Sequence, residues 1–268
     1  MALYFTGDTH GDTTRFSYRK FPESRDFTSD DVMVICGDAG FIWEYPDSKE
    51  SKRDRYDLNW LSTKPYTFLC VCGNHENFNL IEEMPIIDKW NGKVRQCVYD
   101  GVTYDNIFYV DFPTILDIDD KHMLIIPKAD SHDIQFRTED KTWWKQEKGD
   151  ISAEREFIDS HKDEHFDYII THDCAAFLNS CCKPYSISTC LQNTPREIFF
   201  EELRNTLNYD YWIHGHMHHE HELYGTDFRY ALCIYHHIYD ECDIAANFAA
   251  KAENEREWKN HIINMWKE

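Results

Sequence analysis

Short runs of apolar and β-branched residues recur along the chain, separated by Gly, Asp and Asn. Runs of this length that are rich in Val, Ile, Tyr and Phe are typical of β-strands, and the residues between them are typical of turns. The predicted strands cover residues 2–6, 32–36, 66–72, 107–110, 114–118, 123–126, 168–171, 211–213 and 228–235.

Two segments between these strands carry helix-start signals. Ser152 is placed to cap a helix over 153–162, and Thr194 is followed by Pro195 and Glu197, the pattern of a capping box with proline in the first turn. This second helix should reach about residue 207. Helices that alternate with strands, followed by a run of strands, predict a layered α/β domain.

The last residues, from about 249, place Trp258 and Trp266 at helical spacing. We expect a C-terminal helix that packs on the body of the protein, with contact to a partner as the alternative. The sequence contains no repeat, low-complexity tract or Gly/Ser-rich linker, which favours a single domain over 1–268, with the core in 1–240.

Composition limits the function classes. The 268 residues include 42% hydrophobic and 15% aromatic residues, which excludes an intrinsically disordered chain, and the formal net charge is −21 at pH 7. So acidic a chain repels anionic membranes and nucleic-acid backbones unless positive charge is concentrated locally. Long nucleic acids are therefore unfavourable partners, and the oligomeric state stays open.

The cellular setting is predicted from what the sequence lacks. The N-terminus has no basic region or long apolar stretch of a signal peptide, and no segment approaches the length of a membrane span. Together with ten cysteines, this predicts a cytoplasmic protein. Cys174, Cys181, Cys182 and Cys190 could bind zinc, but they lack paired spacing, so ordinary packing is favoured.

Residue types that bind metals are concentrated at the ends of predicted strands. Five of the predicted strands are each followed at once by residues that bind metals in proteins. These residues are Asp8 and His10, Asp38, Asn74 with His75, His172, and His216 with His218.

In layered α/β folds, ligands bind beyond the carboxyl ends of the strands, so these side chains should meet at one edge. The two-residue spacing within Asp8/His10 and within His216/His218 predicts, for extended backbone, that both members face the same side. Oxygen and imidazole donors without thiolate suit Mn, Fe, Zn, Ni or Co. Their number suits two ions bridged by a carboxylate, about 3.5–4 Å apart. A lone histidine or Gly-Asp turn is usually structural, but five such signals in order favour the dinuclear site.

The ordered motifs resemble those of the calcineurin-like metallophosphoesterase superfamily: DxH, GDxx, GNH[DE], H and GHxH. The resemblance implies a four-layer αββα sandwich with the metals at one end. By the same resemblance, the first ion is held by Asp8, His10, Asp38 and His218. The second ion is held by Asp38, Asn74, His172 and His216, so that Asp38 bridges.

This resemblance also implies catalytic roles. A hydroxide between two divalent ions, Mn²⁺ being favoured, attacks phosphorus, and His75 is the candidate that protonates the leaving oxygen. Asn74, His75 and Arg137 are candidate substrate contacts; a surface salt bridge is the alternative for Arg137. The segment 127–147 resembles one found in small bacterial and phage metallophosphoesterases. With the missing targeting signal, this resemblance implies a prokaryotic or phage setting.

One departure from the family pattern concerns the protein Ser/Thr phosphatase branch. That branch has an Asp and an Arg after the second motif, where this chain has Phe41 and Ile42. Phe41, Trp43 and Tyr45 are instead candidates to border the cleft, and the Trp143-Trp144 pair is expected to be buried rather than to wall the site.

The resulting prediction is a phosphomonoesterase for small phosphorylated molecules, nucleotides or phosphoproteins. A phosphodiesterase for small cyclic or linear nucleotides uses the same metal core and is the alternative. A nuclease is less favoured because no Lys/Arg-rich stripe is visible. A non-catalytic scaffold with the same fold is the third alternative, but the chain retains every predicted ligand.

Overall fold

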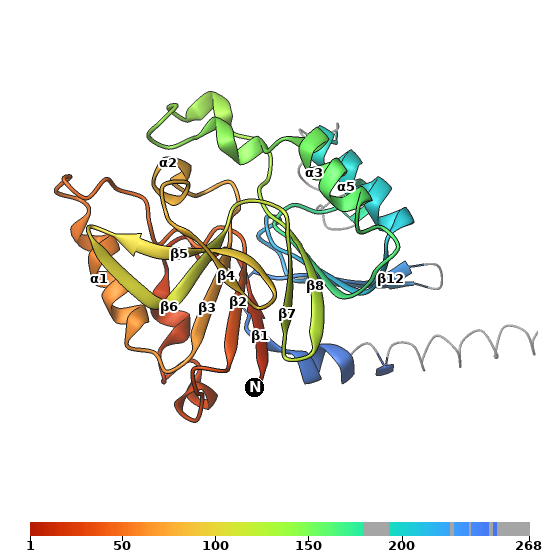
Figure 1. The fold of residues 1–268 in the computed structure, drawn as a ribbon, viewed down its shortest axis with the longest axis horizontal. Helices are drawn as coiled ribbons and strands as arrows, with labels where there is room; N and C mark the ends of the chain where they lie inside the picture. The colour runs from red at the N-terminus through yellow and green to blue at the C-terminus, as the bar shows by residue number, and fades with distance from the viewer. Residues whose placement is uncertain (179–192, 226–227, 236, 247–248, 251–268) are drawn as a thin grey trace, which may run out of the picture.

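Two β-sheets pack face to face, with helices on their outer faces (Figure 1). The computed structural model describes residues 1–178, 193–225, 228–235, 237–246 and 249–250. Residues 251–268, which make up nearly all of the predicted C-terminal helix, lie outside the described residues, as do Cys181, Cys182 and Cys190.

The first sheet has seven strands in the order β13-β1-β2-β3-β6-β5-β4. Its strands are β1 (Leu3–Thr6), β2 (Val32–Cys36), β3 (Thr67–Val71), β4 (Ile86–Lys89), β5 (Gly92–Tyr99), β6 (Val102–Val110) and β13 (Tyr239–Asp240). The second sheet has six strands in the order β11-β12-β10-β9-β8-β7. Its strands are β7 (Thr114–Ile118), β8 (Lys121–Ile126), β9 (His165–Thr171), β10 (Asn208–His214), β11 (His221–Gly225) and β12 (Phe228–Cys233).

The central strands of each sheet run parallel. β1, β2, β3 and β6 pair in parallel in the first sheet, and β8, β9, β10 and β12 do so in the second. Parallel strands end on the same side, so their carboxyl ends form one edge of each sheet. The segment between β8 and α3 lies above this edge (Figure 1).

Strand β2 shows how the sequence builds two cores at once. All five of its residues are buried, and neighbours along it enter different cores. Val32, Val34 and Cys36 enter the core between the sheets, whereas Met33 and Ile35 enter the core on the outer face. Successive side chains of a strand point to opposite faces, so a continuous apolar run is what a strand covered on both sides requires.

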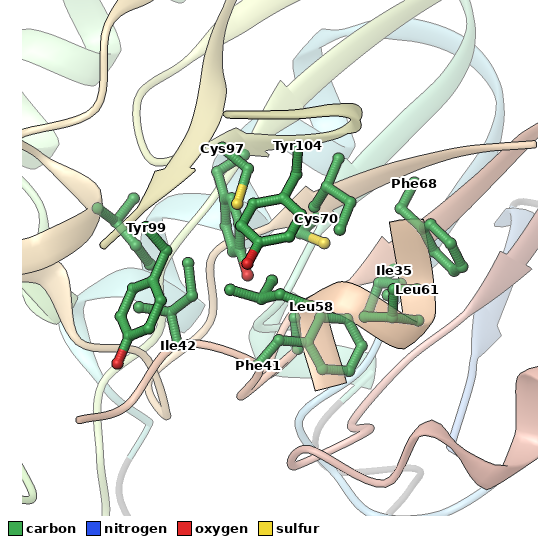
Figure 2. Close-up of a cluster of buried hydrophobic side chains, with 14 of the residues drawn as sticks. Ile35, Phe41, Ile42, Leu58, Leu61, Phe68, Cys70, Cys97, Tyr99 and Tyr104 are labelled. Atoms are coloured by element: carbon green, nitrogen blue, oxygen red, sulfur yellow. The ribbon is translucent and has the colours of Figure 1, made fainter. Parts of the chain in front are cut away.

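The helices complete the outer layers. α1 (Lys52–Ser62) covers the first sheet, where Leu58 and Leu61 pack with Phe41 in the outer core (Figure 2). α3 (Ile151–Asp159) and α5 (Pro195–Thr206) cover the second sheet. Two sheets between two helical layers confirm the predicted four-layer αββα sandwich. A short helix α2 (Phe78–Ile81) and four 3-10 helices are also present. The 3-10 helices are η1 (Thr13–Phe16), η2 (Pro22–Arg25), η3 (Ile134–Phe136) and η4 (Lys145–Lys148).

The predicted strands are confirmed, with ends that shift by a few residues. The prediction missed β4, β5, β11 and β13, which lie toward the sheet margins and whose residues are more mixed in polarity. The predicted capping box of α5 is present, with Thr194 and Glu197 bonded reciprocally. The expected cap of α3 was wrong: Asp150, not Ser152, accepts the free N–H groups of the first turn.

A buried ion pair fastens the segment between β8 and α3 to the helices. Arg196 on α5 is fully buried, and its Nη1 and Nη2 atoms donate to the two carboxylate oxygens of Glu154 on α3, at 3.0 and 2.9 Å. The same guanidinium donates to the carbonyls of Pro127 (3.3 Å) and Lys148 (2.6 Å). Both ends of the segment are therefore held by one side chain.

Removing this guanidinium should destabilise the protein. We expect Arg196→Leu to lower the free energy of unfolding by about 3–5 kcal/mol, because the Glu154 carboxylate is left buried and unpaired. Urea denaturation measures the change. The double variant Arg196→Leu/Glu154→Leu should recover part of the loss, and a double variant as unstable as the single one would contradict this account.

Candidate metal centre

All seven predicted ligands lie at the shared carboxyl edge of the two sheets. Asp8 and His10 follow β1, Asp38 follows β2, and Asn74 follows β3. The second sheet contributes three more residues from the ends of β9 and β10, and they are His172, His216 and His218.

The backbone of these loops is not extended. Asp8, His10, Asp38, His216 and His218 all have positive φ, between 45° and 68°. The expectation that the paired ligands share a side because they alternate along extended chain was therefore wrong. With these left-handed turns, Asp8, His10 and His218 lie in one donor cluster and His216 lies beside His172, at a conformational cost of about 1–2 kcal/mol per residue.

Four of the residues form a compact donor cluster. One ligand atom from each of Asp8, His10, Asp38 and His218 lies within 4.8 Å of the others. His10 Nε2 lies 2.9 Å from His218 Nε2 and 3.7 Å from Asp38 Oδ2, and His218 Nε2 lies 3.5 Å from Asp8 Oδ1. Both histidines are partly exposed while both carboxylates are buried, so the cluster opens to solvent on its imidazole side.

The second predicted set lies deeper. His172 Nε2 is 3.3 Å from Asp38 Oδ1 and 3.1 Å from Asn74 Oδ1, and the His172 ring centre is 5.0 Å from that of His216. Asp38 Oδ2 and His216 Nε2 are buried without a hydrogen-bond partner. Buried polar atoms normally form hydrogen bonds, so two such atoms without a hydrogen-bond partner fit residues whose free lone pairs hold a cation.

Neighbouring groups orient the second set. His172 Nδ1 donates to the carbonyl of Cys36 at 2.9 Å, which turns Nε2 toward the centre. The Asn74 amide nitrogen donates to Ser131 Oγ at 2.9 Å, which turns its oxygen inward. Hydrogen bonds from the outer atoms of ligands to fixed partners are the usual way to orient a metal site.

Hydrogen bonds also tie the loops to one another. Asp38 Oδ1 accepts from the backbone N–H of Asn74 (2.8 Å) and of His75 (2.7 Å), which joins the β2 loop to the β3 loop. The Asp8 carboxylate accepts from the N–H of His216, which joins the first sheet to the second. Buried Glu76, to which the sequence analysis assigned no role, accepts from the N–H of Ala39 at 2.8 Å. Glu76 is the fourth residue of the GNH[DE] motif, and this position in the motif could have indicated its role.

Two glycines leave the space that the site needs. Gly37 has φ of 92°, and a Cβ there would lie 1.8 Å from His172 Nδ1. A Cβ on Gly73 would lie 2.2 Å from Asp38 Oδ1 and 2.5 Å from His172 Cδ2. Any side chain at these positions would displace the groups that face the centre.

The charges of the metal-free site follow from burial and proximity. Burial raises the pKa of Asp8 to about 8, with Asp38 adding to the effect. Burial would also raise the pKa of Asp38 and lower that of His172, but the two attract one another. The pKa of Asp38 is therefore held well below its usual range, and that of His172 is raised to about 10. Burial lowers the pKa of His10 to about 4.

Arg137 lies against His75. Its Nη2 atom lies 2.6 Å from His75 Nε2, and its Nε forms an ion pair with Asp133 Oδ1 at 2.7 Å. The Arg137 side chain is only 8% exposed and that of Asp133 is 51% exposed, so the salt bridge considered from the sequence is present at the rim of the site, together with the contact to His75. A guanidinium only donates, so His75 accepts through Nε2 and is neutral in this arrangement. Burial also lowers the pKa of His75, which favours the same neutral form.

The residues after Asp38 divide between core and cleft. Phe41 and Ile42 are buried in the outer core, so Phe41 does not border a cleft as considered (Figure 2). Tyr45 is 42% exposed. Trp43 lines a pocket of about 380 Å³ beside the donor cluster, together with His10 and His75.

In the segment after β8, Trp144 is buried, as predicted, whereas Trp143, expected to be buried with it, is only partly buried. Glu147, which the sequence did not single out, is fully buried, and its Oε1 accepts from the N–H of Ser131 at 3.1 Å. Ser131 is the residue that orients Asn74. No sequence signal points to this connection, because it depends on how the segment folds over the site.

The fold is an α/β sandwich, and nitrogen and oxygen donors that suit a metal site gather at the carboxyl edge that its two sheets share. The family model of calcineurin-like phosphoesterases matches residues 1–220. The chain belongs to this family, whose members bind divalent metals and are generally hydrolases of phosphate esters. A search of curated proteins found no match.

Three solved structures that match the chain share little sequence with it. Phosphopantetheinyl hydrolase from Mycobacterium tuberculosis is 13% identical, with a TM-score of 0.41, over 87% of this chain and 89% of that one. A protein of unknown function from Aquifex aeolicus is 16% identical, with a TM-score of 0.34, over 91% and 98%. A 5′-nucleotidase precursor from Thermus thermophilus is 12% identical, with a TM-score of 0.41, over 88% of this chain and 48% of that one.

Among the described residues, no helix combines the length and apolar character that crossing a bilayer requires.

Metal binding should release protons. In the metal-free site, Asp8 with a pKa of about 8 and His172 with a pKa of about 10 carry protons at neutral pH, and a divalent cation competes with them. We therefore expect the affinity for Mn²⁺ to rise with pH from 6.5 to 8.5. Calorimetric titrations in two buffers of different ionisation enthalpy count the protons released. Asp8→Asn should release fewer, and a pH-independent affinity would contradict the assignment.

Proposed function

We propose that this protein is a dinuclear metal-dependent phosphoesterase that acts as a phosphomonoesterase on small phosphorylated molecules. The observation that supports it best is the pair of unpartnered buried atoms, Asp38 Oδ2 and His216 Nε2, facing a centre to which two sheets contribute donors. Asp8, His10, Asp38 and His218 would hold one ion, and Asp38, Asn74, His172 and His216 the other. We favour Mn²⁺, with Fe, Zn, Ni or Co as alternatives.

Two bound divalent ions would supply an activated water near neutral pH and would stabilise charge on the phosphoryl oxygens. The chain's own residues position these partners. Asp38 lies between the two donor sets and is fixed by the N–H groups of Asn74 and His75, so its second oxygen keeps a constant direction.

His75 and Arg137 would act at the leaving side of the phosphate. Arg137 is a buried cation beside the donor cluster, which suits a phosphoryl oxygen. When it exchanges its contact with His75 for such an oxygen, His75 Nε2 is free to take up a proton from solvent water. His75 would then pass this proton to the leaving oxygen and return to its neutral form. Asp133 holds the guanidinium during this exchange through its bond to Nε.

The first test is an assay with p-nitrophenyl phosphate after removal and replacement of the metals. We expect turnover that requires Mn²⁺, a loss of at least about 10³-fold in Asp38→Asn because one carboxylate serves both ions, and a loss of ~10²–10⁴-fold in kcat for His75→Ala. Ion content measured by atomic emission separates lost binding from lost chemistry.

The same assay is carried out with the diester bis-p-nitrophenyl phosphate. Preference for the diester would replace the monoesterase with the phosphodiesterase alternative. Two bound ions without turnover of either ester would support the non-catalytic scaffold, and binding of fewer than two ions would refute the dinuclear site.

Arg137 should affect substrate binding. We expect Arg137→Ala to raise KM by about 10- to 100-fold, since a charge-assisted hydrogen bond to phosphate is lost. Arg155→Ala is the matched control, because Arg155 forms an exposed ion pair with Glu202 on the outer helices. An unchanged KM in Arg137→Ala would exclude Arg137 from phosphate binding.

A further inference from the structure

A pocket adjoins the open side of the donor cluster. It has a volume of about 380 Å³ and is lined by His10 and His75 on the side of the metal centre, and by Trp43, Glu44, Glu50 and Arg53 beyond it. This volume falls in the range of small-molecule sites, which begins near ~300 Å³. His75 belongs both to the proposed catalytic set and to the pocket wall, so the pocket extends from the place where the leaving oxygen would lie.

The pocket wall at Trp43 and Glu44 is held rigidly. The backbone N–H groups of both residues donate to Asp54 Oδ2 on α1, each at 2.7 Å. The Trp43 carbonyl accepts from Asn77 Nδ2 at 2.7 Å, and the Glu44 carbonyl accepts from the Tyr99 hydroxyl at 2.6 Å. Every backbone polar group of this dipeptide is thus bonded, so a ligand meets a preformed surface.

The indole of Trp43 is oriented by its neighbours. It packs edge to face on buried Trp144, with ring centres 5.1 Å apart and an interplanar angle of 87°. It lies nearly parallel to the His75 ring, at an angle of 25° and 6.5 Å between centres. The side chain is only partly buried, and it supplies the aromatic part of the pocket wall.

The charges of the pocket disfavour a second anionic group. Three carboxylates line the pocket, those of Glu44, Glu50 and Asp54, against one arginine, Arg53, so the wall carries excess negative charge. Arg53 pairs with Asp57 at 3.5 Å and donates to the Gly11 carbonyl at 3.1 Å. Carboxylates only accept hydrogen bonds when ionised, so the pocket suits a ligand that brings N–H or O–H donors.

We propose that this pocket binds the leaving group of the substrate and selects an uncharged planar ring that carries hydrogen-bond donors. The substrate class is then a phosphate monoester of the nucleoside monophosphate type. This inference rests on the proposed phosphomonoesterase function. The ring packs on Trp43, and the donors of the base or sugar face Glu44 and Glu50. Aliphatic phosphates lose the aromatic contact, and nucleoside diphosphates bring an additional negative charge close to the carboxylates of the pocket wall.

The test compares kcat/KM for adenosine 5′-monophosphate and ribose 5-phosphate, which share the reacting ester and differ in the ring. We expect the nucleotide to be preferred by at least about fivefold, which is the lower end of what base–aromatic stacking contributes. Trp43→Leu should remove most of this ratio, and Trp43→Tyr should retain most of it. A general loss of activity cancels in the ratio, so it does not imitate the effect.

Tyr56→Leu is the matched control, because Tyr56 is an aromatic residue on α1 that is 69% exposed and lies outside the pocket wall. Its ratio should equal that of the unaltered protein. A ratio near one in the unaltered protein, a ratio insensitive to Trp43→Leu, or a preference for a phosphoserine peptide would overturn the inference while leaving the phosphomonoesterase intact.

Calorimetric titration of the Mn²⁺-loaded protein with adenosine 5′-monophosphate separates the two failures. The nucleotide should bind the unaltered protein about tenfold more tightly than it binds Trp43→Leu, whether or not turnover occurs. If turnover is absent but this difference is found, the pocket assignment stands and the proposed function fails. Equal affinity in both proteins would refute the pocket assignment.

Discussion

The buried carboxylate of Asp38 is the group on which the geometry of the site depends. It has no exposed surface, and its Oδ1 is held by two N–H groups of the β3 loop and lies 3.3 Å from His172 of the second sheet. An isolated buried carboxylate is costly, so it is tolerable only where donors and positive charge surround it. Those partners come from both sheets. The sandwich must therefore dock in one register before this charge is satisfied.

The same constraint explains the unusual backbone around it. Five predicted ligands occupy left-handed conformations, which non-glycine residues avoid. Strain of this kind persists where the surrounding structure over-determines it, and it collects at functional sites. Here the loops leave strands that are buried on both faces, and hydrogen bonds such as that from the His216 N–H to Asp8 tie one loop to the next. The packed strands and these hydrogen bonds therefore hold the ligand loops in their strained conformations.

The surroundings of His75 show how the chain departs from the pattern of the Ser/Thr phosphatase branch. Phe41 and Ile42 occupy the sequence positions of that branch's Asp and Arg, and both are buried under α1. An arginine and an aspartate nevertheless lie next to one another beside His75, supplied by Arg137 and Asp133 of the segment after β8. That segment is fixed at both ends by Arg196, so a buried ion pair between the outer helices positions a cation at the metal edge.

The sequence by itself determined the layered α/β class and the predicted strands, because apolar runs between turn residues are local signals. It also determined which loops contribute the candidate donors, because each predicted ligand directly follows a strand. Only the tertiary structure decided the left-handed turns that aim them, the contact of Arg137 with His75, and the connection from Glu147 through Ser131 to Asn74. It also decided that Asp54 fixes the loop of Trp43. These contacts join residues far apart in the chain, and they exist only after both sheets and the segment above them have packed.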